Sequence, residues 1–167
     1  IGHFLMHWKI KALIQKGIAL LPESLSYEVY YWIQRHFGNL KRVNPVSRLN
    51  AGIEIWKRAK SNGYDPDNKS FFEVGTGRIP LVPIAFWLMG ANKTVTVDLN
   101  PYLEEELVRE SMKYICDNFA EIEQLFGPLL VRDRFKSLLQ LTSEGDFSVP
   151  GLMQLCHIDY IAPGDAA

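Results

Sequence analysis

The stretch Phe71-Phe72-Glu73-Val74-Gly75-Thr76-Gly77-Arg78 predicts a buried strand that ends in an acidic residue and a glycine turn. A helix follows the turn, and the stretch Val-Thr-Val-Asp-Leu-Asn over residues 95–100 then contains the acidic end of a second strand, Asp98. Glycines at such a turn let a ligand lie against the backbone, and an acid at the next strand end can accept from ribose hydroxyls. The pattern therefore predicts an α/β unit that binds a molecule carrying a nucleoside.

Two prolines restrict which molecule of this kind fits. A dinucleotide-binding turn has a third glycine, at position 80 here, and a helix start whose free N–H groups hold a pyrophosphate. This chain has Pro80 and Pro83 instead, and proline has no N–H to donate. The sequence therefore favours a ligand without a pyrophosphate, and the carboxylate of Glu73 favours one with a positive charge.

The run Glu73-Val74-Gly75-Thr76-Gly77 resembles motif I of the class I S-adenosylmethionine (SAM)-dependent methyltransferases. Asp98 matches the acid at the end of their second strand, whereas Ile79 stands where motif I has its third glycine. The resemblance implies a Rossmann-like sheet and SAM as the cofactor. It assigns cofactor contacts to the motif I residues, to Asp98 and to its neighbour Leu99.

The end of the chain extends the resemblance. Residues 157–161, His-Ile-Asp-Tyr-Ile, predict a short third strand, and Gly164-Asp165-Ala166 resembles the Gly-Asp-Ala that follows this strand in many of these enzymes. In that family the Asp accepts a hydrogen bond from the adenine amino group, so the resemblance assigns Asp165 and Ala166 to the cofactor site. Asp98 and Asp165 are far enough apart in sequence that we expect an insertion before the third strand.

Each feature also has a simpler interpretation. Gly75 and Gly77 can be turn glycines of any α/β unit, Asp98 can cap a helix, and Asp165 can belong to a surface turn. Two alternative functions therefore stay open. One is an NAD-type Rossmann-like binder that uses the same turn, and the other is a non-catalytic module that keeps the fold without a cofactor.

Helical periodicity predicts an N-terminal layer of three helices. We expect an amphipathic helix over residues 3–21, an aromatic-rich helix over 27–37, and a third that opens at Asn44 with Pro45 as its first helical residue. We therefore divide the chain into an N-terminal helical cap, residues 1–63, and a Rossmann-like SAM-binding domain, residues 64–167. The cap can cover the cofactor entrance, as such helices do in the family, or pack as ordinary core.

The second domain is expected to contain further helices. An almost entirely apolar helix over residues 81–89 should be buried on two sides, and a second strand should follow over 94–99. We then expect one long helix over 102–126, a helix near 135–141 and a loop over 143–151. The glutamates at 104–106 favour the start of the long helix, and because consecutive residues do not share a helix face we expect no metal site there.

Charge is divided unevenly along the chain. Residues 1–63 contain ten Lys or Arg and three Asp or Glu, a net +7, whereas residues 64–167 contain eight and sixteen, a net −8. The basic part can be a solvated face, dock on the acidic part, attract an anionic substrate or lie peripherally on an anionic membrane. We expect a small-molecule substrate, since no clear nucleic-acid pattern is present. Two cysteines without CxxC spacing fit a cytoplasmic setting.

Only three strands are predicted, whereas the family has seven in the order 3-2-1-4-5-7-6. Strand 4 pairs with strand 1 in that order, and without it an apolar strand edge is left open, which proteins normally avoid. We therefore expect these residues to form the N-terminal half of a longer enzyme whose catalytic residues follow strand 4. The histidines are candidate bases, but no catalytic role is assigned to them: His3, His7, His36 and His157.

Overall fold

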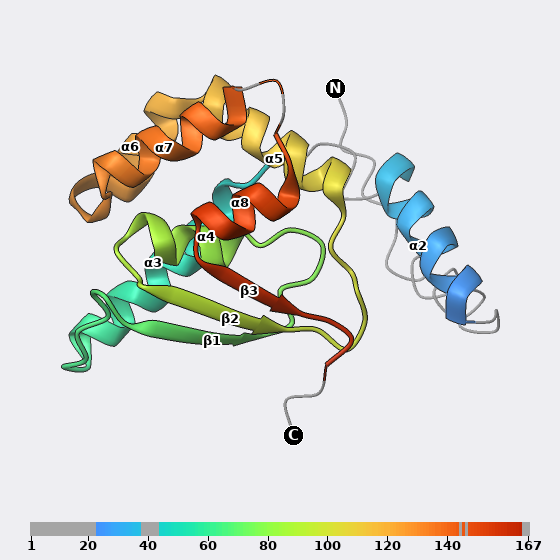
Figure 1. Ribbon diagram of the computed structural model, residues 1–167, viewed down its shortest axis with the longest axis horizontal. Coiled ribbons are helices and arrows are strands. Elements are labelled where there is room, and N and C mark those ends of the chain that lie inside the picture. Colours follow the sequence, from blue (N-terminus) through green and yellow to red (C-terminus); the bar gives the residue numbers. More distant parts are fainter. Residues whose placement is uncertain (1–22, 38–43, 144, 146, 165–167) are drawn as a thin grey trace. The chain divides into compact units, whose positions relative to one another are not determined.

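The computed structural model describes residues 23–37, 44–143, 145 and 147–164 (Figure 1). By its contacts the chain divides into two compact units, residues 1–43 and 44–167. The first unit contains the helix α2 (Glu23–Phe37), which begins four residues before the predicted start. The helix predicted over 3–21 lies outside the described residues. The second unit begins at Asn44, so the third predicted helix belongs with the sheet, whereas the sequence analysis placed a boundary after residue 63.

Three parallel strands form the sheet: β1 (Ser70–Val74), β2 (Lys93–Val97) and β3 (Ile158–Ile161). Their order is β1-β2-β3, so β2 is central. The register places Glu73 beside Thr96 and Thr96 beside Tyr160, in a row near the carboxyl ends of the strands. The predicted α/β class with a parallel sheet is thereby confirmed.

Phe71 of β1 joins two helices to the sheet. The helix α3 (Val46–Ser61) and the helix α4 (Leu81–Leu88) contact each other and lie on the same face as Phe71. The Phe71 ring stacks on Trp56 of α3 and Phe86 of α4, with ring centroids 5.6 and 4.2 Å apart. This aromatic stack fixes both helices against β1.

Helix α4 is buried on nearly all sides, as its apolar sequence predicts. Of its eight residues only Val82 is not fully buried. The outer helices that cover it are held by Arg134, whose Nη1 donates to the carbonyls of Trp87 and Ala91 at 2.7 and 2.6 Å. The Trp87 carbonyl also accepts from the Gly90 N–H at 3.0 Å, so Arg134 adds a second donor at the end of α4. Through these bonds Arg134 attaches α7 to α4 and to the segment that follows it.

The chain between β2 and β3 is helical. It comprises α5 (Glu105–Asp117), α6 (Phe119–Phe126), the 3-10 helix η2 (Gly127–Leu129), α7 (Arg132–Ser143) and α8 (Val149–Leu155). The prediction of one long helix over 102–126 is wrong, because Asn118 leaves helical geometry (φ −120°) and its Nδ2 donates to the Tyr114 carbonyl at 2.9 Å. The expected loop over 143–151 ends early, because Ser148 caps α8 by accepting from the Gly151 N–H.

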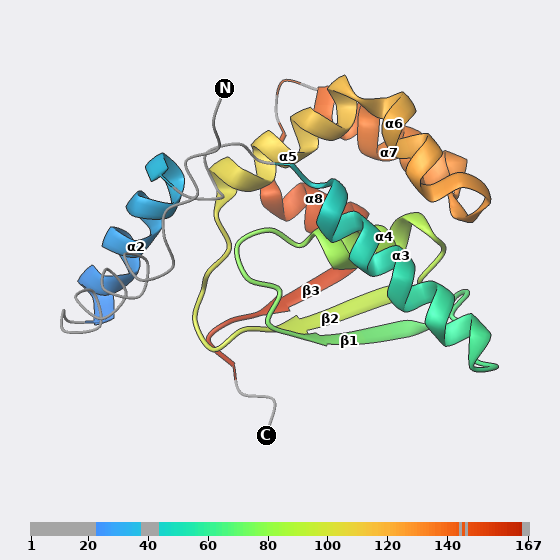
Figure 2. The ribbon, with the colours of Figure 1, turned by 180° about the vertical axis from the view of Figure 1, so that it is seen from behind.

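The opposite face of the sheet is open. In both views the described helices of the second unit lie on one side of the sheet (Figures 1 and 2). On the other side, Phe72, Val74 and Ile161 are 62%, 64% and 48% exposed. The sheet therefore presents an apolar surface that no helix in the described part of the chain covers.

Candidate functional site

The glycine turn lies where β1 ends and α4 has not yet begun, at the carboxyl edge of the sheet (Figure 1). Gly75 and Gly77 have φ values of +82° and +74°, which residues with a side chain rarely adopt. A Cβ atom added to either glycine would meet no atom within 4 Å. The turn is thus bent by its glycines and faces open space instead of packed protein.

Asp98 lies directly beside this turn. Its side chain is almost fully buried, and its Oδ2 accepts a hydrogen bond from the Gly77 N–H at 3.0 Å. Its backbone N–H donates to the Ile161 carbonyl and its carbonyl accepts from the Gly164 N–H, at 3.0 and 2.9 Å. Asp98 therefore joins the ends of all three strands. It does not cap a helix, since α5 begins only at Glu105.

A second polar cluster is formed by Glu73, Thr76 and Thr96. The Thr76 hydroxyl contacts both the Glu73 carboxylate and the Thr96 hydroxyl, and Thr96 Oγ1 donates to Glu73 Oε2 at 3.3 Å. Burial raises the pKa of Glu73, while the bonds from the two threonines oppose that rise. The nearby charge of Asp98 raises this pKa further, and that of Arg48 lowers it. A cationic ligand here would relieve the cost of burying this carboxylate.

Tyr160 of β3 closes the row of polar side chains. Its hydroxyl accepts from the Tyr102 N–H at 3.1 Å and lies 3.4 Å from the Asn100 carbonyl. Burial and the charge of Asp98 raise the pKa of Tyr160, so the phenol keeps its proton at neutral pH. Sequence reasoning missed Tyr160 and Thr96. The signal that could have found them is the alignment of their strands with Glu73 at the same edge.

The start of α4 offers few backbone donors to a ligand. The Leu81 N–H donates to the Ile79 carbonyl at 2.9 Å, and the Ile84 N–H donates to the Pro80 carbonyl at 3.0 Å. Pro83 has no N–H. Within the described residues, Val82 is the one member of the first turn whose N–H has no hydrogen-bond acceptor. A pyrophosphate would therefore find little of the helix-start support that dinucleotide sites provide.

Of the three other residues predicted to contact the cofactor, the structure describes one. Leu99 follows Asp98 and is 70% exposed, so its side chain is free to contact a ligand. Asp165 and Ala166 lie outside the described residues, and their assignment stays a prediction.

The glutamates at the start of α5 form ion pairs. Glu104 pairs with Arg78 at 3.3 Å, and the Glu104 N–H also donates to the Arg78 carbonyl, which attaches the glycine turn to α5. Glu105 pairs with Arg109 at 2.8 Å. Among the described residues, no group of three or more His, Cys, Asp or Glu is arranged to hold a metal ion.

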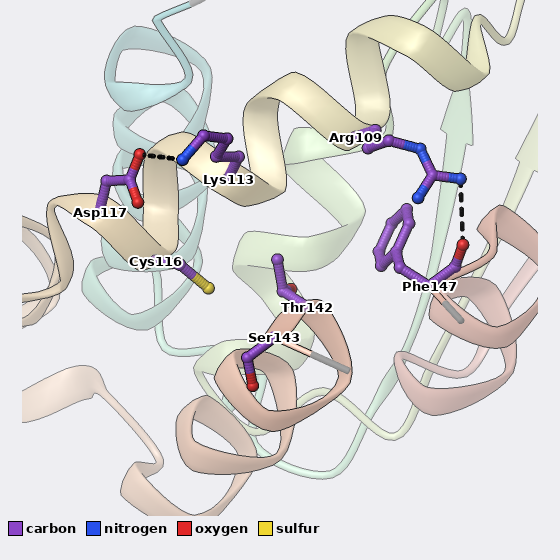
Figure 3. Close-up of a pocket in the computed structure, with 7 residues that line it drawn as sticks. All are labelled: Arg109, Lys113, Cys116, Asp117, Thr142, Ser143 and Phe147. Carbon is purple, nitrogen blue, oxygen red and sulfur yellow. Dashed lines mark hydrogen bonds and ion pairs between the residues drawn. The ribbon is translucent and has the colours of Figure 1, made fainter. Parts of the chain in front are cut away.

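A cavity of about 340 Å³ lies away from the glycine turn, between α5, α7 and the segment before α8 (Figure 3). Its polar side chains already have partners: Lys113 pairs with Asp117 at 2.8 Å, and Arg109 donates to the Phe147 carbonyl at 3.0 Å. Figure 3 shows Thr142 between these two pairs and Cys116 beside Lys113 and Asp117. None of the residues that the sequence analysis assigned to the cofactor lines this cavity.

Comparisons of the chain with protein-family models, with curated proteins and with solved structures found no match. The search of the described residues for a helix both long and apolar enough to cross a membrane found none. The glycine turn and the strand ends are therefore the part of the described chain that bears on function.

Proposed function

We propose that this protein is a SAM-dependent methyltransferase. The observation that carries the proposal is the placement of the Asp98 carboxylate 3.0 Å from the Gly77 N–H, at the rim of a glycine turn with open space in front of it. A carboxylate beside an accessible backbone is the combination that holds a ribose close to a protein chain. The strand order, with β1 and β3 on either side of β2, is consistent with strands 1 to 3 of the family.

Each polar group has a role in this proposal. Asp98 accepts from the ribose hydroxyls, and Leu99 lies next to it with an exposed side chain that can contact the adenine. Glu73 faces the positively charged part of the cofactor, oriented by Thr76 and Thr96. Gly75 and Gly77 leave room for the cofactor along the turn. Asp165 and Ala166 are proposed contacts of the adenine.

The turn discriminates against NAD because it lacks helix-start donors. A pyrophosphate carries two negative charges, and at α4 it would meet one unbonded N–H while lying near the carboxylates of Glu73 and Asp98. SAM has a sulfonium and an ammonium group in place of the pyrophosphate, and the carboxylates of Glu73 and Asp98 attract these cationic groups. The electrostatics of the turn therefore favour SAM.

When bound, SAM supplies an activated methyl group, and the chain's own residues bind and orient it. The proposed methyl acceptor is a small molecule, and the proposed location of the enzyme is the cytoplasm. No base is assigned among the described histidines. The Nδ1 atoms of His36 and His157 lie 2.9 Å from the backbone carbonyls of Trp32 and Asn92, respectively, which gives both rings a structural partner.

Calorimetric titration of the protein with S-adenosylhomocysteine and, separately, with NAD tests the proposal. S-adenosylhomocysteine keeps the adenosine and the amino acid of SAM without its methyl group, so it should bind. NAD should give no heat of binding at the same concentrations. Tight NAD binding without a response to S-adenosylhomocysteine would refute the proposal, and no response to either would leave a non-catalytic module as the better interpretation.

A further inference from the structure

A cationic side chain lies close to the glycine turn from a helix that precedes the sheet. Arg48 is in the first turn of α3, and residues spaced by four on a helix share a face. Its partners on that face are Gly52 and Trp56, both of which are buried. The contacts of these two residues show which elements this face of α3 meets.

Gly52 brings α3 against the start of α4. A Cβ on Gly52 would lie 2.7 Å from Ala85 Cβ and 3.4 Å from the Val82 carbonyl, so the helices touch within the first two turns of α4. Trp56, one turn further along α3, stacks on Phe71 of β1. One turn before Gly52, Arg48 therefore lies beside the glycine turn that connects β1 to α4.

The charges agree with this geometry. Burial raises the pKa of the Glu73 carboxyl, and the positive charge of Arg48 opposes that rise, which agrees with the place of Arg48 one turn before Gly52. The Arg48 side chain is exposed and, within the described residues, forms no hydrogen bond or ion pair. The turn is thus flanked by the carboxylate of Glu73, which attracts cations, and by the guanidinium of Arg48, which can donate hydrogen bonds to an anion.

From this arrangement we infer that Arg48 and Glu73 together recognise the zwitterionic amino-acid end of the cofactor, Arg48 binding its α-carboxylate and Glu73 its α-ammonium group. The inference rests on the proposed function and adds to it a cofactor-binding residue from outside motif I. A guanidinium is suited to this role because its N–H donors match the two oxygens of a carboxylate.

The test compares two ligands that differ in the amino acid alone. S-adenosylhomocysteine carries it, whereas 5′-methylthioadenosine keeps the adenosine and the thioether without it. Arg48→Ala should weaken S-adenosylhomocysteine binding about tenfold or more and leave methylthioadenosine binding unchanged. Arg48→Lys, which keeps the charge but not the fork of donors, should lose less. Arg58→Ala, an exposed arginine at the far end of the same helix, is the matched control and should change neither affinity.

Three outcomes would overturn the inference. Equal weakening of both ligands in Arg48→Ala would mean that Arg48 supports the turn without contacting the amino acid. Unchanged binding of both would mean that it has no part in recognition, while the proposed function would stand. Failure of the unmodified protein to bind either ligand would remove the proposed function and the inference together. Thermal melting of each variant verifies that it is folded.

Discussion

At the scale of single residues, Asp98 is held through both its backbone and its side chain. Its backbone N–H donates to Ile161 at the end of β3, and its carbonyl accepts from Gly164 just beyond that strand. Its carboxylate accepts from the Gly77 N–H. A carboxylate has room for further donors beyond this one bond. Its position is therefore fixed by the fold, and the proposed function requires the remaining lone pairs of this buried carboxylate to accept from a ribose.

Asp98→Asn should weaken S-adenosylhomocysteine binding at least tenfold. The substitution keeps one acceptor oxygen but removes the charge, and charge-assisted hydrogen bonds contribute about 1.5–3 kcal/mol. Calorimetric titration measures the change. The control is Asp159→Asn on β3, an exposed carboxylate that pairs with Lys93. Unchanged affinity in a folded Asp98→Asn variant would show that Asp98 serves the strand ends alone.

Glu73 makes a prediction about pH. Because burial raises its pKa, the folded state binds this proton more tightly than the unfolded state does. The contribution of the Glu73 carboxyl to the stability of the folded state is therefore fully present below the ordinary pKa of a glutamate. It is lost as the pH rises through the raised pKa of the folded state. Glu73→Gln cannot titrate, so its melting temperature should gain on that of the unmodified protein as the pH rises above the ordinary pKa of a glutamate. Parallel melting curves over that range would contradict the burial of a titrating carboxyl.

At the scale of elements, the local patterns were predicted well. The glycine turn, the apolar helix α4 and the three strands lie within a few residues of their predicted places, because each is encoded by a continuous run of residues. The break at Asn118 was missed, since a side chain that bonds the Tyr114 carbonyl can end a helix without a glycine or a proline. The cluster of Thr96 and Tyr160 beside Glu73 was also missed, because it depends on register between distant strands.

Gly75→Val tests whether the turn contacts the ligand. A β-branched residue at φ +82° is strained, and we expect a loss of stability of about 1–2 kcal/mol together with loss of S-adenosylhomocysteine binding. Gly63→Val is a matched control. Gly63 follows α3 with φ +81°, and an added Cβ there also meets no atom within 4 Å, so the strain is similar but far from the turn.

Thermal melting and calorimetry separate the two effects. Both variants should melt at lower temperatures than the unmodified protein, and Gly63→Val should bind S-adenosylhomocysteine normally. Normal binding by Gly75→Val as well would show that the turn does not touch the ligand and that its resemblance to motif I is accidental.

At the scale of the whole molecule, the sheet has one covered and one open face. Phe72 and Val74 are exposed on the open face, and β1 has a strand on one side only within the described residues. In a parallel ladder alternate residues direct their N–H and C=O groups to opposite sides of the strand. Because the Gly75 N–H donates to the Val97 carbonyl of β2, the backbone N–H and C=O groups of Phe72 and Val74 point to the other side of β1, the open edge of the sheet. Such an edge is a template for association with another chain.

The 167-residue chain should therefore self-associate through this surface. Phe72→Lys with Val74→Lys should shift the chain toward the monomer in size-exclusion chromatography, because lysine on an edge strand opposes pairing. Ile55→Lys on α3 is the control, since it removes a 47% exposed apolar side chain away from the sheet. A monomeric unmodified chain that melts cooperatively would mean that the open face is tolerated and that a smaller α/β fold is complete without a fourth strand.

The central claim is that the adenosine of the cofactor lies against the glycine turn and Asp98, and mapping of ligand binding by NMR tests it most directly. Backbone amide shifts of the ¹⁵N-labelled protein would be followed during titration with S-adenosylhomocysteine. We predict the largest changes at Gly75, Thr76, Gly77 and Leu99. The cavity lined by Arg109, Lys113 and Phe147 should change little. The largest changes at that cavity, with an unaffected glycine turn, would contradict the claim.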